Sequence, residues 1–212
     1  MTSPAKTLSV ADLQAGLSKY NSLQGHNTQA TQALVNSINT VTASYSLYRQ
    51  LAFIAHTIWE SGGYQYNEEL AAITAPYSAK DDYQTCDWNI GAVATNGKFF
   101  YGRGYMQLSW CANYKAYGQD RMINNDADYF YKNPDLVATL PYSIDSGAWY
   151  FEQRVTDNSG RFGLTTKDIN GPLECYSGNN YVGSKPQKRY QIFVALASQV
   201  GLTGYSEGGC YN

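Results

Sequence analysis

The segment 47–63, LYRQLAFIAHTIWESGG, most constrains the fold, because it predicts a helix that is apolar on two faces. Four aliphatic residues recur at helical spacing and form one stripe: Leu47, Leu51, Ile54 and Ile58. The opposite face carries Phe53, His56 and Glu60. We expect such a helix to be buried on both sides, with the rest of the chain packed around it.

This helix is expected to end at Ser61, Gly62 and Gly63, which places Glu60 in its last turn. The negative end of the helix dipole disfavours a charged carboxylate there, as a general acid requires. On these residues alone, Glu60 is more typical of a solvated side chain at a helix end.

The remaining pattern predicts a mainly α fold with long polar loops and little β structure. We expect helices at about 9–17 with Ser9 as N-cap, 28–40, 141–154 and 187–200, and a helical turn from Asn133. Residues 64–98 are expected to be irregular and residues 155–186 to be rich in loops, and 99–117 to form either a short strand or a turn leading into a helix. We expect residues 1–7 to be a disordered leader and 8–212 to form a single domain.

Composition excludes some partners. With 15 Lys and Arg against 17 Asp and Glu, the net charge of −2 provides no basic surface for nucleic acid. No apolar run is long enough to cross a membrane. The 20 Tyr and 19 Gly residues suit a polar groove with flat aromatic faces for neutral sugars, and nothing indicates more than a monomer.

The chain has four cysteines and no metal-binding spacing, which favours disulfides over a zinc site: Cys86, Cys111, Cys175 and Cys210. Disulfides indicate an oxidising compartment, so we expect a secreted protein. Neither a metal nor an organic cofactor is expected.

Glu69 lies nine residues after Glu60. One protonated and one ionised carboxyl group are the minimum needed to hydrolyse a glycosidic bond. The residues alone do not rank Glu69 above its neighbour Glu68.

Four motifs, in this order, carry a resemblance to a known family: HTIWESGGYQYNEEL, FFYGRGYMQLSWCANY, KNPDLVATLPYSIDSGAWYF and FGLTTKDINGPLECYSG. They resemble the catalytic domain of family 19 glycoside hydrolases, the plant-type chitinases. The resemblance, strongest over 46–212, implies a lysozyme-like fold with a substrate cleft between two lobes. It also implies inverting endo-hydrolysis of β-1,4-linked N-acetylglucosamine polymers, with chitin as substrate.

The resemblance assigns roles to individual residues. Glu60 matches the general acid, Glu69 the general base, and Ser109 the residue that helps to hold the attacking water. Three amides match residues that line the substrate cleft, although each could also be satisfied within its own loop: Gln107, Asn113 and Asn170.

Glu174 and Arg189 match a charge network around the catalytic acid, against the alternative of a weak surface ion pair. Cys175 and Cys210 match a disulfide of the family. We predict that Cys86 and Cys111 form the second, which would hold the irregular loop against the QLSW segment.

The chain also departs from the family pattern. Trp59 stands where a His usually precedes the acid, and Ala112 stands at a cleft position where an aromatic residue is usual. His56 could bond Glu60, but an ordinary core histidine is favoured. These departures keep two alternatives open: a hydrolase of chitosan or peptidoglycan, and a catalytically weak, glycan-binding defence protein.

Overall fold

The helix expected around Glu60 is present in the computed structural model as α3 (Leu47–Glu60). It begins at Ser46, whose side chain accepts a hydrogen bond from the Arg49 amide and caps the first turn. Every residue from Gln50 to Ile58 is buried. The prediction of a helix buried on both faces is therefore confirmed.

The structure describes residues 3–74, 78–156, 159–175 and 184–210. These fall in two units, which are described separately below. The first unit comprises residues 1–63 and 151–212, and the second unit comprises residues 64–150.

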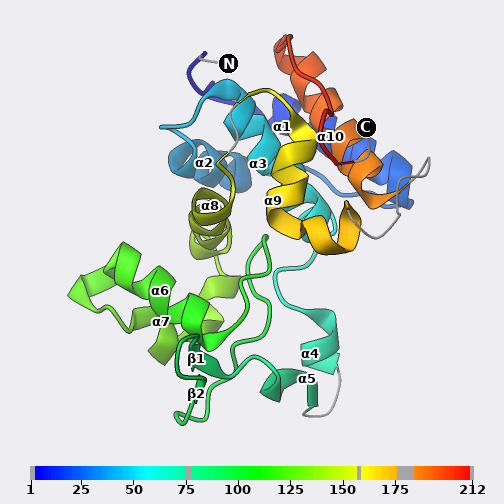
Figure 1. The fold of residues 1–212 in the computed structure, drawn as a ribbon. Coiled ribbons are helices and arrows are strands. Elements are labelled where there is room, and N and C mark those ends of the chain that lie inside the picture. The colour runs from blue at the N-terminus through cyan, green and yellow to red at the C-terminus, as the bar shows by residue number, and fades with distance from the viewer. Residues whose placement is uncertain (1–2, 75–77, 157–158, 176–183, 211–212) are drawn as a thin grey trace. The chain divides into compact units, whose positions relative to one another are not determined.

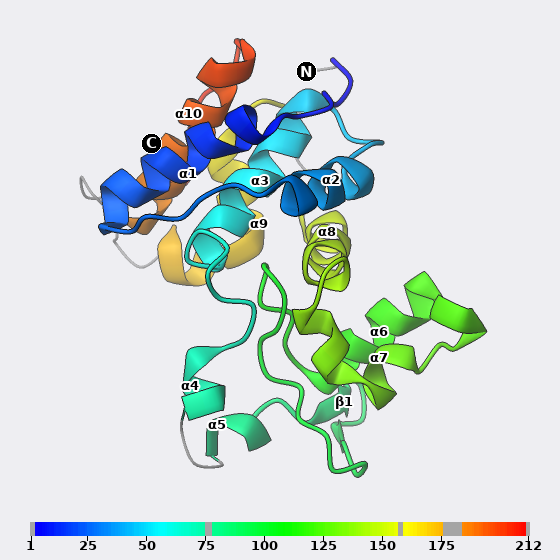
Figure 2. The same ribbon diagram turned by 180° about the vertical axis from the view of Figure 1, so that it is seen from behind.

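In the first unit, α3 packs against α10 (Lys185–Val200), and α10 also runs along α1 (Val10–Gln24) (Figures 1 and 2). Gly16 allows this close approach, because a Cβ there would lie 2.8 Å from Leu196 Cδ2. The unit also contains α2 (Gln32–Val41), which has Thr31 as N-cap, and α9 (Phe162–Glu174).

The second unit is rich in loops and surrounds an aromatic core. Its buried residues include Phe100, Tyr114, Tyr117, Phe130 and Trp149. Strands β1 (Thr85–Asp87) and β2 (Ala92–Val93) pair as a short antiparallel hairpin. The other elements are α4 (Leu70–Thr74), α5 (Ser78–Asp81), α6 (Cys111–Arg121), η1 (Ile123–Asn125), α7 (Tyr129–Lys132), η2 (Pro134–Ala138) and α8 (Tyr142–Arg154), which continues into the first unit from Phe151.

The mainly α fold class is confirmed. Ser9 caps α1 through a capping box with Asp12, as the sequence predicts. The segment 99–117 resolves into a loop followed by α6. None of the helices in the described residues is long and apolar enough to cross a membrane.

Three expectations are wrong. The segment 64–98 is expected to be irregular, but it contains α4, α5 and the β1–β2 hairpin. The segment 155–186 is expected to be rich in loops, but 13 of its residues form α9, whose Gly163, Gly171 and Pro172 weaken the helical pattern. The segment 1–7 is not a disordered leader from Ser3 onward, because the Lys6 amide and carbonyl both bond the Gln50 side chain and Pro4 pairs with Ser46.

Both disulfide predictions are confirmed. Cys175 is bonded to Cys210, so the end of α9 is linked to the C-terminal segment of the first unit. Cys86 is bonded to Cys111, so β1 is linked to the start of α6 in the second unit.

Candidate active site

Arg189 is the centre of a buried ion network in the first unit. Its side chain is 1% exposed and donates from Nε to Glu174 Oε2 at 2.9 Å and from Nη2 to Glu174 Oε1 at 2.7 Å. Nη2 also donates to Glu60 Oε1. This two-point contact with Glu174 is the geometry that favours arginine over lysine. The alternative of a weak surface ion pair is therefore wrong.

The network keeps its buried groups charged. Burial alone would raise the pKa of Glu174, but the hydrogen bonds and charge of Arg189 outweigh it and lower that pKa. Burial alone would lower the pKa of Arg189, yet the charges of Glu60 and Glu174 raise it. Asn170 adds a further hydrogen bond from Nδ2 to Glu174 Oε1 at 2.9 Å. Glu60, Arg189, Glu174 and Asn170 are thus joined as one network.

His56 lies on the other side of the guanidinium. Its Nε2 is 2.8 Å from Thr165 Oγ1, and that hydroxyl donates its own hydrogen to the Phe162 carbonyl at 2.7 Å. The hydroxyl can therefore only accept from His56, so Nε2 carries the proton and Nδ1 accepts from Arg189 Nη1 at 3.4 Å. Its two ring nitrogens thus contact Thr165 and Arg189, and its role is that of a core histidine.

This arrangement predicts a pH dependence of stability. Burial and then the Arg189 charge hold the pKa of His56 well below the ordinary value of 6.5 for histidine. In the unfolded chain the ring binds a proton as the pH falls through about 6.5, whereas the folded ring stays neutral. Stability is therefore present above that pH and is lost as the pH falls below it, by up to about 1.4 kcal/mol per pH unit.

Urea unfolding at about pH 7.5 and about pH 5.5 measures this loss, since side-chain carboxylates contribute little in that window. His56→Asn keeps an acceptor for Arg189 but cannot titrate, so its stability is expected to change less between the two pH values. An equal change in both proteins would contradict the assignment.

In the second unit, Glu69 is held by two donors. Its Oε2 accepts from the Gly102 amide at 3.2 Å, and its Oε1 accepts from the Tyr83 hydroxyl at 3.1 Å. Its own amide donates to the Gly102 carbonyl at 2.8 Å. Burial, followed by the charge of Glu69, raises the pKa of Tyr83, which keeps the phenol protonated as a donor. Glu69 is therefore a fixed carboxylate acceptor.

Ser109 and Gln107 lie against the same glycine. A Cβ on Gly102 would be 2.7 Å from Gln107 Oε1 and 3.3 Å from Ser109 Oγ, so a side chain here would displace the end of Gln107. Ser109 Oγ donates to the Gln107 carbonyl at 2.9 Å, and Asn113 Nδ2 donates to the Ser109 carbonyl at 2.8 Å. The YGRG and QLSW motifs thus gather these polar side chains beside the residue that binds Glu69.

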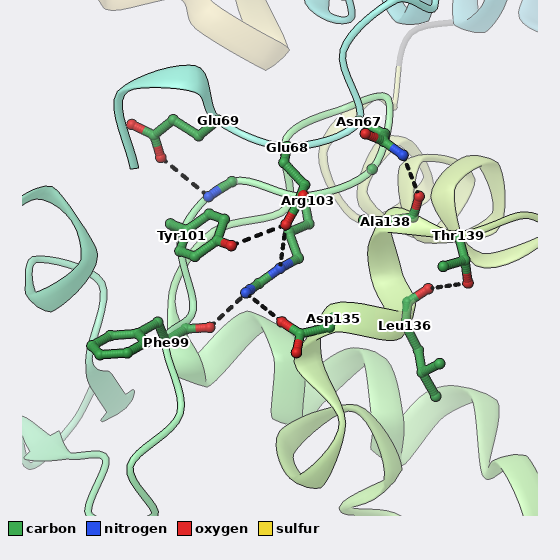
Figure 3. Close-up of polar contacts among 12 residues, drawn as sticks. Asn67, Glu68, Glu69, Phe99, Tyr101, Arg103, Asp135, Leu136, Ala138 and Thr139 are labelled. Atoms are coloured by element: carbon green, nitrogen blue, oxygen red, sulfur yellow. Dashed lines mark hydrogen bonds and ion pairs between the residues drawn. The ribbon is translucent and has the colours of Figure 1, made fainter. Parts of the chain in front are cut away.

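Glu68 has different partners (Figure 3). Its Oε1 accepts from the Tyr101 hydroxyl at 2.9 Å and lies 3.4 Å from Arg103 Nε. Arg103 is 2% exposed, stacks 3.8 Å from the centre of the Tyr101 ring, and donates to Asp135 at 2.7 Å. Glu68 is therefore part of an ion network that fixes the loop carrying Glu69.

Sequence reasoning missed three supporting residues: Tyr83, Gly102 and Arg103. Gly102 and Arg103 belong to the YGRG motif, so a signal existed, but only the fold shows what they bind. Tyr83 lies in an irregular segment, where one of many tyrosines carries no signal of its own.

Comparisons with known proteins agree with this fold. Endochitinase EP3 of Arabidopsis thaliana is 36% identical over 154 residues, which are 71% of this chain and 50% of that protein. Chitinase C from Streptomyces griseus superimposes with a TM-score of 0.65 at 26% identity, covering 96% of each chain. A bacterial family 19 chitinase superimposes with a TM-score of 0.57 at 28% identity, covering 98% of this chain and 94% of that one.

The chain spans about half the length of the plant relatives that it matches. No family model matches it. The mainly helical fold and these similarities define a glycoside hydrolase domain. The chain belongs to family 19, the chitinase family.

Proposed function

We propose that this domain hydrolyses chitin-type polymers of β-1,4-linked N-acetylglucosamine, cutting within the chain and inverting the anomeric carbon. Glu60 acts as general acid, and Glu69 acts as general base on a water molecule. The names of its relatives, endochitinase and chitinase, support the substrate class. The observation that carries the proposal is the set of contacts around Glu69 and Ser109.

Those contacts suit the activation of water. The Ser109 hydroxyl gives its only hydrogen to the Gln107 carbonyl, so its oxygen is left to accept a hydrogen bond. A water molecule that donates one hydrogen to Ser109 and the other to Glu69 keeps a lone pair for attack on the anomeric carbon. Glu69 then takes the proton as the new bond forms.

The acid is oriented by its guanidinium partner. Arg189 holds Glu60 through Oε1, which leaves Oε2 to carry the proton for the leaving oxygen. The Glu60 side chain is 25% exposed, whereas that of Arg189 is 1% exposed, so the carboxyl group is the member of the pair that solvent or substrate can reach. The reaction needs no metal ion or organic cofactor.

Three amides are proposed as substrate contacts: Gln107, Asn113 and Asn170. Each uses its NH₂ group in a bond within the protein, to Gly104, Ser109 and Glu174 respectively. These bonds orient the amides so that the carbonyl oxygens can accept from the N-acetyl and hydroxyl groups of a sugar. We also infer that the protein is secreted and acts as a monomer, the former supported by its two disulfides.

Initial rates on three substrates test this proposal. Chitin hexamer is expected to be cleaved faster than a fully deacetylated hexamer or peptidoglycan. The proposed amide contacts bind N-acetyl groups, which the deacetylated hexamer lacks, and they suit a chain of identical N-acetylglucosamine units, which peptidoglycan is not. Faster cleavage of either rival would change the assigned polymer. Binding of all three without turnover would favour the glycan-binding alternative.

A further inference from the structure

A cavity lies in the second unit, between the β1–β2 hairpin and α6. Its volume is about 410 Å³. Side chains from the hairpin and from one face of α6 line it, including Trp88, Asn89, Ile90, Ala112, Lys115 and Gln119. The family resemblance places Ala112 at a cleft position, so the cavity adjoins the expected cleft, but the other lining residues have no role in the site described above.

The most unusual side chain in this cavity is Trp88. It is 57% exposed, although tryptophan is usually largely buried. Its ring is tilted against Trp110 with the ring centres 5.3 Å apart, and Trp110 meets the edge of Tyr83 at the same separation. Tyr83 in turn donates to Glu69. A row of aromatic rings therefore leads from the cavity to the proposed catalytic base.

The hairpin that carries Trp88 is well fixed. The disulfide from Cys86 to Cys111 ties it to the start of α6. The turn after β1 is closed by two hydrogen bonds to Asp87, from the Asn89 amide to Oδ1 at 2.8 Å and from the Gly91 amide to the carbonyl at 2.8 Å. A large aromatic face is thus held exposed at little further cost in conformational entropy on binding.

The opposite wall comes from α6, where Ala112, Lys115 and Gln119 follow helical spacing. Ala112 has only a methyl group, which leaves room for the cavity. The side-chain amides of Asn89 and Gln119 form no hydrogen bond to other described residues, and each offers a donor and an acceptor. Lys115 Nζ already lies 4.6 Å from the centre of the Tyr131 ring.

We propose that this cavity is an additional sugar-binding subsite, in which one N-acetylglucosamine unit stacks on Trp88. A flat apolar ring bordered by neutral amides fits a pyranose, which has an apolar face and a rim of hydroxyl and amide groups. The identity of the sugar rests on the proposed function. The evidence for the site is the exposed Trp88 ring, the cavity beside Ala112 and the disulfide that fixes the hairpin.

Nuclear magnetic resonance tests this subsite without requiring catalysis. The Glu60→Gln variant is titrated with chitin hexamer while the indole N–H signal of Trp88, assigned through Trp88→Phe, is followed. That signal is expected to shift. Trp88→Ala is expected to weaken hexamer binding by about threefold to tenfold, the loss of one stacking contact.

Val93→Ala is the matched control, because Val93 is 62% exposed on the same hairpin but does not line the cavity. It should bind hexamer like the parent. Ala112→Leu, which fills the cavity and leaves Trp88 in place, should weaken binding as Trp88→Ala does. Equal affinities for Trp88→Ala and Val93→Ala, or an unmoved Trp88 signal at saturating hexamer, would overturn the proposal.

Failure of this inference is distinguishable from failure of the proposed function. If wild-type protein cleaves chitin hexamer while the Trp88 signal stays unmoved, the subsite is wrong and the function stands. If the Trp88 signal shifts but wild-type protein does not cleave the hexamer, the subsite stands and the catalytic assignment fails.

Discussion

Glu60→Gln is expected to lower kcat on chitin hexamer by about 10²- to 10⁴-fold, the contribution typical of a positioned general acid. The amide oxygen of Gln can still accept the hydrogen bond from Arg189, so the fold should be retained. Glu69→Gln is expected to cause a loss of the same order, because an amide cannot take the proton from water. Steady-state kinetics with thermal unfolding of each variant separates lost chemistry from lost structure.

Glu68→Gln is the matched control for Glu69→Gln. Both replace a carboxylate by an amide at neighbouring positions, but Glu68 is bound to Tyr101 and Arg103. It should retain kcat close to that of the wild type, with a modest loss of stability. Full activity in Glu69→Gln together with a large loss in Glu68→Gln would reverse the assignment of the base.

The second large effect is expected from Arg189→Met, which removes the cation and keeps an apolar side chain of similar length. Glu174, 2% exposed, would then be a buried carboxylate without its partner. Leaving such a charge uncompensated is expected to cost about 3–5 kcal/mol of unfolding free energy. Urea unfolding near neutral pH, where Glu174 is ionised, measures this loss.

A double variant gives the control for that measurement. Adding Glu174→Leu to Arg189→Met removes both buried charges, so much of the lost stability should return. A loss below about 1 kcal/mol in the single variant, the value of an exposed ion pair, would show that the buried network contributes little.

Local patterns predicted several elements well. The sequence predicts the helix from Leu47 to Ile58 and the cap at Ser9, because both features depend on residues close in sequence. The failure over α9 has the same origin. Its Gly163 and Pro172 are poor helix formers, and the helix is held by partners distant in sequence, including a backbone bond from Phe162 to Ser206 and the disulfide from Cys175 to Cys210.

The candidate site was predictable only in part. Periodicity predicted a buried helix ending at Glu60. Arg189 and Glu174 were assigned to the charge network around Glu60 only through the family resemblance. Residues alone could not separate Glu68 from Glu69. Their different roles depend on the groups that each contacts. Glu68 contacts Tyr101 and Arg103, whereas Glu69 accepts from Tyr83 and the Gly102 amide. Such contacts join distant segments and leave no periodic signal.

The central claim is that Glu60 acts as acid while Glu69 activates a water molecule, so that the bond is broken in one displacement. The anomeric form of the first product tests it most directly. Proton magnetic resonance of a chitin hexamer digest, recorded before the anomers interconvert, should show the α-anomer at the new reducing end. An initial β-anomer would mean a retaining, two-step reaction and would contradict the roles assigned to Glu69 and Ser109.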